Sequence, residues 1–329
     1  MRVVRSVPFA PFLLVVAAAI GCGDSVTAPD PPPPNSVRLQ SDPQDYIGQG
    51  RSYEYTSANA SITVTATGRH LSVVVDGDES WVADFEGPAS TTRLQVGTYS
   101  NLTRYPFHDA QRGGLSWSGE GRGCNTLTGS FTIDSVTYRG DTLTALDLRF
   151  EQHCEGGTAA LRGTIHWRSD DRTRPAGPAA IPSTLWRPPA GATPASGDFV
   201  YLQSDAGDYI GGGATYTYTQ ANSSIVVTAT GRHLSVGVEG WSGDFEAMNT
   251  VSRIEPGYYP DLIRWPFHNP AKGGLSWFGQ GRGCNTLEGW FAVDRVTYVG
   301  NTLTALEMRF EQHCDGSTPA LRGAIRWRV

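Results

Sequence analysis

The sequence has 329 residues, of which 39 are Gly and 21 are Pro. This length suits two domains of ordinary size, and the many Gly and Pro residues favour turns over long helices, which excludes an all-helical protein. The formal net charge is −6 and Lys272 is the only lysine. No basic tract could therefore neutralise a phosphate backbone, and nucleic acid is excluded as a partner.

Residues 1–21 have the layout of a secretory signal peptide. Arg2 and Arg5 precede an apolar run of about 14 residues, which is too short to cross a bilayer as a helix. Residues 19–22, Ala-Ile-Gly-Cys, resemble the lipobox of bacterial lipoproteins, and the resemblance implies that the Cys becomes the lipidated N-terminus. We expect a signal peptide over 1–21 and lipidation of Cys22. The alternative is an ordinary secreted protein cleaved nearby.

A Pro-rich tether over 22–36 follows the expected lipid anchor. Pro29 and the prolines at 31–34 favour an extended, stiff spacer. We expect this tether to hold the rest of the chain away from the membrane.

The rest of the chain contains two copies of one module. Residues 41–48 recur as 204–211, and residues 149–154 recur as 309–314. Similarity within one chain indicates repeated structural units. The predicted organisation is module 1 over 37–168, a Pro-rich linker over 169–198 and module 2 over 199–329.

Apolar and polar residues alternate in many segments of both copies. In 62–66, 146–150 and 161–167 the alternation is that of half-buried antiparallel strands, and no stretch shows a helical stripe. Short strands separated by glycines predict an all-β fold. We expect two similar antiparallel β-sandwich domains, with a jelly roll as one arrangement of their strands.

Four segments carry a resemblance to a known kind of module. They are Tyr-Pro-Phe at 105–107, Gly-Arg-Gly-Cys-Asn-Thr-Leu at 121–127, Phe-Glu-Gln-His-Cys at 150–154 and Ile-His-Trp at 165–167. The pattern resembles an uncharacterised β-sandwich module of secreted, often multidomain bacterial proteins. The resemblance implies β structure and an extracytoplasmic location, and it brings no activity or binding residues with it.

The four cysteines after Cys22 form one pair in each module. Each pair would close a loop of about 30 residues, and export makes disulfides plausible. A metal site that combines these cysteines with the adjacent histidines is the alternative, although zinc sites usually have other spacings. The predicted disulfides are Cys124–Cys154 and Cys284–Cys314.

Paired aspartates form loops that we expect to precede the first strand of each module. Closely spaced carboxylates together with loop carbonyls suit Ca²⁺, and turn or capping hydrogen bonds are the alternative. Calcium is the only cofactor that the sequence suggests. The candidate ligands are Asp42, Asp45, Asp205 and Asp208.

Other recurring polar residues leave two alternatives open, an acid–base or metal site and ordinary structural hydrogen bonding. Glu120 is replaced by Gln280, which removes one candidate carboxylate for glycoside hydrolysis from the second copy. The recurring groups are His70/His233, His108/His268, His153/His313, Glu151/Glu311 and Asp84/Asp244.

Three polar positions of module 1 are aromatic in module 2. Aromatic side chains on an outer face mark a ligand platform or an interface. The alternatives are packing against the linker, where Leu185 and Trp186 are the only large apolar pair, packing against module 1, and scattered exposure without a role. The replacements are Thr98 by Tyr258, Ser118 by Phe278 and Ser130 by Trp290.

These observations predict a cell-envelope lipoprotein that displays two non-catalytic modules for binding, adhesion or envelope structure. We expect it to be lipid-anchored and extracytoplasmic, at the outer membrane or cell surface. The expected partners are the membrane, through the lipid anchor, and a glycan or an envelope protein. The alternative function is a secreted or surface hydrolase that acts on glycans.

Overall fold

The computed structural model describes residues 33–329, and every regular element in this range is a β-strand. None of these residues forms a helix long and apolar enough to cross a membrane. The expected signal peptide over 1–21, Cys22 and most of the tether lie outside the described residues.

The two modules have the same ten strands in the same order. Module 1 contains β1 (Ser36–Ser41), β2 (Ser52–Thr56), β3 (Ser61–Thr67), β4 (His70–Asp76), β5 (Ser80–Glu86), β6 (Gly97–Arg104), β7 (Gly114–Gly119), β8 (Leu127–Arg139), β9 (Thr142–Cys154) and β10 (Ala160–Arg168). Module 2 contains β11 (Phe199–Ser204), β12 (Thr215–Thr219), β13 (Val226–Thr230), β14 (His233–Val238), β15 (Trp241–Ala247), β16 (Gly257–Arg264), β17 (Gly273–Gly279), β18 (Leu287–Val299), β19 (Thr302–Cys314) and β20 (Ala320–Arg328).

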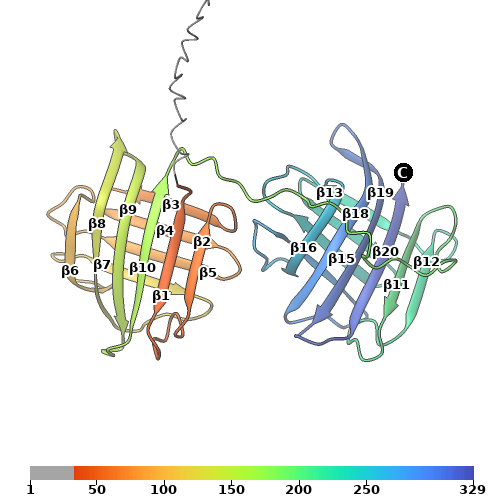
Figure 1. Cartoon of the computed structure of the whole chain (residues 1–329), viewed down its shortest axis with the longest axis horizontal. Coiled ribbons are helices and arrows are strands. Elements are labelled where there is room, and N and C mark those ends of the chain that lie inside the picture. The colour runs from red at the N-terminus through yellow and green to blue at the C-terminus, as the bar shows by residue number, and fades with distance from the viewer. Residues whose placement is uncertain (1–32) are drawn as a thin grey trace, which may run out of the picture. The chain divides into compact units, whose positions relative to one another are not determined.

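Each module is one curled sheet that folds back on itself. The order in module 1 is β2-β1-β10-β9-β8-β6-β7-β5-β4-β3, and module 2 repeats it. All neighbours are antiparallel except β6 and β7, which pair in parallel over two residue pairs. The strands from β2 to β6 form a first layer, and those from β7 to β3 cross behind it as a second layer (Figure 1). The predicted all-β sandwich fold is confirmed, and the strand order is a curled meander and not the two Greek keys of a jelly roll.

Aromatic side chains join the two layers. Phe85 on β5 meets Phe131 and Phe150 of the first layer, with ring centroids 5.3 and 5.6 Å apart. Trp117 on β7 stacks on Phe150 at 4.9 Å. Gly163 makes room for the Phe150 ring, because a Cβ there would lie 2.3 Å from Phe150 Cε1. Module 2 repeats these contacts with Phe245, Phe291, Phe310, Trp277 and Gly323.

A buried glutamine completes the sheet where β6 and β7 separate. Gln152 is fully buried; its Nε2 donates to the Trp117 carbonyl at 2.9 Å, and its Oε1 accepts from the Trp117 amide at 2.8 Å. Gln312 makes the same two bonds to Trp277. Buried backbone groups need partners, and here one side chain takes the place of a neighbouring strand.

Each module contains one disulfide. Cys124 is bonded to Cys154, and Cys284 to Cys314. The sequence prediction of these two pairs is confirmed. Each bridge lies beside the buried glutamine, since Gln152 Nε2 is 3.9 Å from Cys124 Sγ.

Replacing the glutamine should destabilise module 1. Gln152→Leu leaves the Trp117 amide and carbonyl buried without partners, and each such group costs about 1–3 kcal/mol. We expect the free energy of unfolding of module 1 to fall by roughly 2–5 kcal/mol in denaturant titrations. Gln40→Leu, at an exposed position on β1, is the control. Equal stability of the two variants would contradict the role given to Gln152.

Candidate binding face

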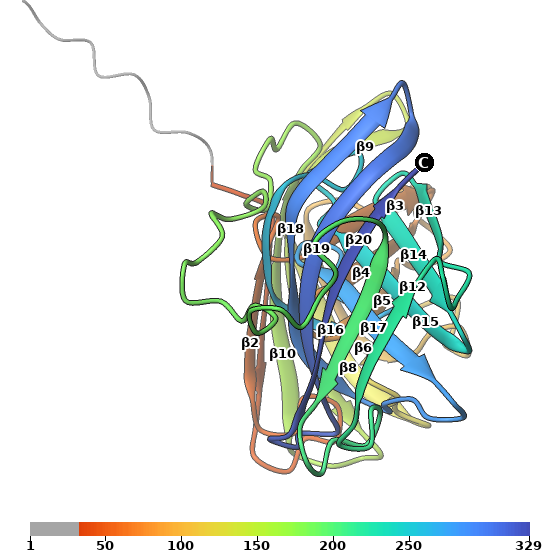
Figure 2. The ribbon, with the colours of Figure 1, turned by 90° about the vertical axis from the view of Figure 1, so that its right-hand side faces the viewer.

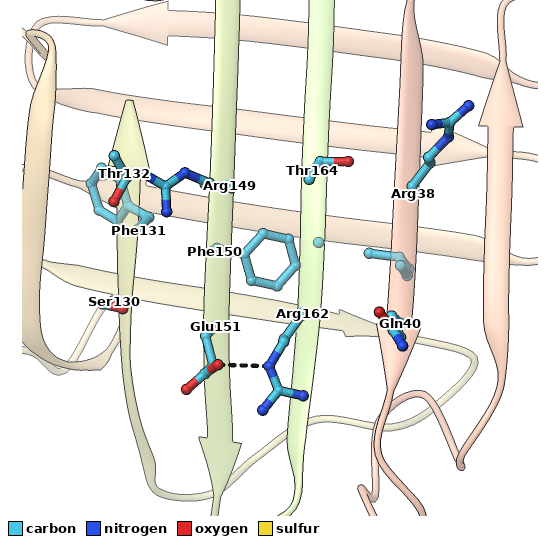
Figure 3. A pocket seen from close by; sticks show the side chains of 12 residues that line it. Arg38, Gln40, Ser130, Phe131, Thr132, Arg149, Phe150, Glu151, Arg162 and Thr164 are labelled. Atoms are coloured by element: carbon cyan, nitrogen blue, oxygen red, sulfur yellow. Dashed lines mark hydrogen bonds and ion pairs between the residues drawn. The ribbon is translucent and has the colours of Figure 1, made fainter. Parts of the chain in front are cut away.

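A hollow of about 600 Å³ lies on the outer side of the first layer in module 1 (Figure 3). We call this side, formed by β1, β8, β9 and β10, the outer face. Small residues lie between long charged ones, which leaves the surface hollowed. The side chains that line it are Arg38, Gln40, Ser130, Thr132, Arg149, Glu151, Arg162 and Thr164.

Strand alternation places these groups on one side of the layer. On β9, Leu148 and Phe150 are buried in the core, so Arg149 and Glu151 point outward. The same alternation on β10 buries Ile165 and exposes Thr164. The face is therefore built from rigid strands, which fix the positions of its polar groups.

Ion pairs balance the charge of the outer face. Arg162 lies 2.7 Å from both Glu151 and Asp42. Hydrogen bonds from His153 and Arg162 hold the pKa of Glu151 below its usual range, although burial opposes them. The bond from Arg162, with the Ala160 amide, also lowers the pKa of Asp42.

Two further guanidinium groups are paired at the edges of the hollow. Arg149 lies 3.1 Å from Asp134, and Arg38 lies 2.8 Å from Glu54. The face therefore offers guanidinium N–H donors and hydroxyl groups without a strong net charge. Such groups bind carbonyl, carboxylate or hydroxyl oxygens of a chain lying across the strands.

In module 2 the linker covers the corresponding outer face. It runs across β18, β20 and β11 (Figure 1) and lies on the side of this layer that faces away from β14 and β15 (Figure 2). Arg309, the counterpart of Arg149, donates to the backbone carbonyl of Trp186 in the linker. The side chain of Arg309 is 4% exposed, whereas that of Arg149 is 60% exposed. Within the part of the chain that the structure describes, the same face is thus open in module 1 and occupied in module 2.

The three aromatic residues predicted as a platform do not share one face. Tyr258 and Trp290 are half-buried neighbours with centroids 6.0 Å apart. Tyr258 forms a β-bridge with Ala179, so the linker packing considered from sequence applies to it. Phe278 lies on β17 in the second layer and is 39% exposed. Ligand binding by the Tyr258–Trp290 pair stays a prediction, and Phe278 is not part of that surface.

The paired aspartates hold loops together. Asp45 is buried, and its Oδ2 accepts from the Gly48 amide at 2.7 Å and from the Ser41 hydroxyl at 2.8 Å. Asp42 is bonded to Arg162 and the Ala160 amide. Asp205 and Asp208 repeat both arrangements.

Protein donors therefore use the oxygens that a calcium ion would need. In the range 33–329, no three His, Cys, Asp or Glu side chains are grouped so that they could hold a metal ion. The calcium hypothesis does not fit these loops, and the turn and capping alternative does.

The recurring acids and histidines do not converge on one site. His70 is the first residue of β4; its ring Nε2 donates to a carboxylate oxygen of Asp84 at 2.9 Å, and the ring stacks on Tyr105 at 4.8 Å. Phe85 and Phe150 meet in the core, so their outward neighbours Asp84 and Glu151 point to opposite sides of the module. The carboxylates that the hydrolase alternative would pair are therefore separated by the sandwich.

Removing Arg309 should loosen the linker. The substitution Arg309→Ala deletes the bond to the Trp186 carbonyl and leaves Asp294 without its closest partner. We expect amide hydrogen exchange in residues 176–187 to become roughly tenfold faster or more. Arg149→Ala, the matched change in module 1, should leave this exchange unchanged. Equal protection of the linker in both variants would show that Arg309 does not hold it.

The residues of the open hollow were not singled out from the sequence. A signal was available, because Arg149 and Arg309 recur whereas Arg38 and Thr164 are replaced by Tyr201 and Ala324. Comparison of the chain with protein-family models, with curated proteins and with solved structures found no match.

Proposed function

We propose that this chain is a cell-envelope lipoprotein that binds an extended extracytoplasmic polymer on the outer face of module 1. The observation that carries the proposal is the comparison between the two copies. The face that holds a linker segment in module 2 is left open in module 1 by residues 33–329, with a hollow of about 600 Å³ and an exposed Arg149. Sites on rigid strands with several convergent polar groups are suited to binding.

The location rests on the sequence and on the disulfides. Disulfides are typical of proteins that leave the cytoplasm, and this chain has two. The lipobox-like residues 19–22 and the Pro-rich tether support attachment to a membrane through Cys22. The resemblance to secreted bacterial modules supports the same location.

A retention assay tests the binding proposal. The mature chain is immobilised and exposed to cell-envelope extracts and a glycan panel, and bound and released material are measured separately. Arg149→Ala should weaken retention about tenfold or more, because a hydrogen bond to a charged group contributes about 1.5–3 kcal/mol. Thr164→Trp should block the hollow and give a similar loss.

Arg112→Ala is the matched control for the retention assay. Arg112 is 63% exposed and paired with Asp109, as Arg149 is 60% exposed and paired with Asp134. It lies outside the outer face, between β6 and β7, and its loss should not change retention. Equal retention by all three variants would reject the site, and product release without retention would support the hydrolase alternative.

Membrane attachment has a separate test. Cys22→Ser removes the expected lipidation site, so the variant should move from the detergent phase to the aqueous phase in phase partitioning. Unchanged partitioning would reject lipidation of Cys22 and leave the binding proposal intact.

A further inference from the structure

The outer face of module 2 recognises the linker mainly through its backbone. The amide of Ala179 donates to the Tyr258 carbonyl at 2.9 Å, and the Tyr258 amide donates back at 2.8 Å. Arg309 donates to the Trp186 carbonyl. Contacts of this kind hold an extended polypeptide of many different sequences, as in strand addition to a sheet edge.

Two side chains of the linker add sequence-dependent contacts. Trp186 packs against Phe199, Tyr201 and Ala324. Arg187 lies 3.6 Å from Asp294, the carboxylate that also binds Arg309. Between Ala179 and Trp186 the linker turns, with the Leu185 amide donating to the Pro182 carbonyl at 3.2 Å. The side-chain contacts of the linker therefore fall at two adjacent residues that follow this turn.

Module 1 keeps the groups that contact the backbone. Arg149 is held by Asp134 as Arg309 is held by Asp294. Thr98 lies opposite Thr132 of β8, as its counterpart Tyr258 lies opposite Ala292 of β18. The bridge that the linker adds at Tyr258 has no counterpart at Thr98 within residues 33–329. Among residues 33–329, nothing pairs with the strand edge at Thr98, and Arg149 bonds Asp134 only through Nε, so its terminal nitrogens can donate to a chain.

Module 1 changes the residues that receive Trp186. Phe199, Tyr201 and Ala324 correspond to Ser36, Arg38 and Thr164, so an apolar surface becomes one that carries hydroxyl groups and a guanidinium paired with Glu54. A carboxylate fits this surface through the Thr164 hydroxyl and Nη1 of Arg38, since Nε and Nη2 of Arg38 bond Glu54. Asp134 remains available for a basic neighbour, as Asp294 is for Arg187.

One contact of module 2 is not repeated. Arg326 donates to three linker carbonyls, those of Pro194, Ala195 and Gly197. Its counterpart His166 lies 2.6 Å from Asp147 and is engaged within the module. The bound segment on module 1 would therefore end near β10 and β1.

We infer that the polymer bound by module 1 is a segment of another polypeptide, added at Thr98, turning as the linker does at 182–185, and crossing β8 and β9 to place an acidic side chain against Arg38 and Thr164. This inference rests on the proposed function and names its ligand class. A glycan would lack the alternating amides and carbonyls that Thr98 and Arg149 can pair with.

Synthetic peptides of linker residues 176–190 test the inference by fluorescence anisotropy against the mature chain with Cys22→Ser. The peptide carrying Trp186→Glu should bind, and the peptide with native Trp186 should bind at least tenfold more weakly. Arg149→Ala in the protein should lower the affinity for the peptide carrying Trp186→Glu tenfold or more. Arg38→Glu should abolish its binding, and a peptide carrying Trp186→Lys should then bind instead.

The controls separate the sites and the ligand classes. Arg112→Ala should not change peptide affinity. Loss of binding in Arg309→Ala but not in Arg149→Ala would place the peptide on module 2 and overturn the inference. Tighter binding of the native Trp186 peptide would identify the linker of a second copy as the ligand and would also overturn it.

The failure of the inference differs from that of the proposed function. In one outcome, Arg149→Ala does not change the binding of any peptide but still weakens the retention of protease-resistant envelope glycan. The inference then fails, and the binding proposal stands. If retention of every material is independent of Arg149, the proposed site itself fails.

Discussion

In each module the sheet has a gap in its backbone hydrogen bonding, and the side chain of one buried glutamine fills this gap. β6 and β7 pair over only two residue pairs, so the backbone of Trp117 would otherwise lie unpaired in the core. Gln152 supplies both missing partners from the opposite layer. Closure in this way turns the two outer faces away from each other, so Glu151 and Asp84 cannot meet. A site in this fold has to be built on one layer alone, as the hollow of module 1 is.

The duplication separates what the fold requires from what the surface is used for. Gln152 and Gln312, like the aromatic residues around them, are the same in both copies because closure and packing tolerate little change. The outer faces differ where the linker lies. Arg38 becomes a buried Tyr201, and the exposed Thr164 becomes a buried Ala324. Since the frame beneath is unchanged, these differences follow from what covers each face.

Local patterns in the sequence predicted the local structure, and non-local pairing limited the rest. Alternation in 146–150 identified strand β9, and the repeated spacing of Cys124 and Cys154 identified the bridge. Strand order depends on contacts such as that of Ser36 with His166, which no local pattern records.

The same limit explains why the sequence groups Phe278 with Trp290 and gives no direct sign of the hollow. An outward-facing residue has the same sequence pattern in either layer, and the structure places Phe278 on β17 and Trp290 on β18. The hollow could have been inferred only by noticing that Trp186 precedes the copy whose positions 199, 201 and 324 are less polar.

A tethered linker needs little affinity, because a short connection holds it at about millimolar effective concentration. A partner on a separate chain has no such tether, so its affinity comes from contacts alone. An exposed apolar face would bind many proteins without specificity. The apolar patch of module 2 is covered by Trp186 of the linker, whereas the corresponding positions of module 1 are polar, so that face can stay exposed to water without inviting indiscriminate association.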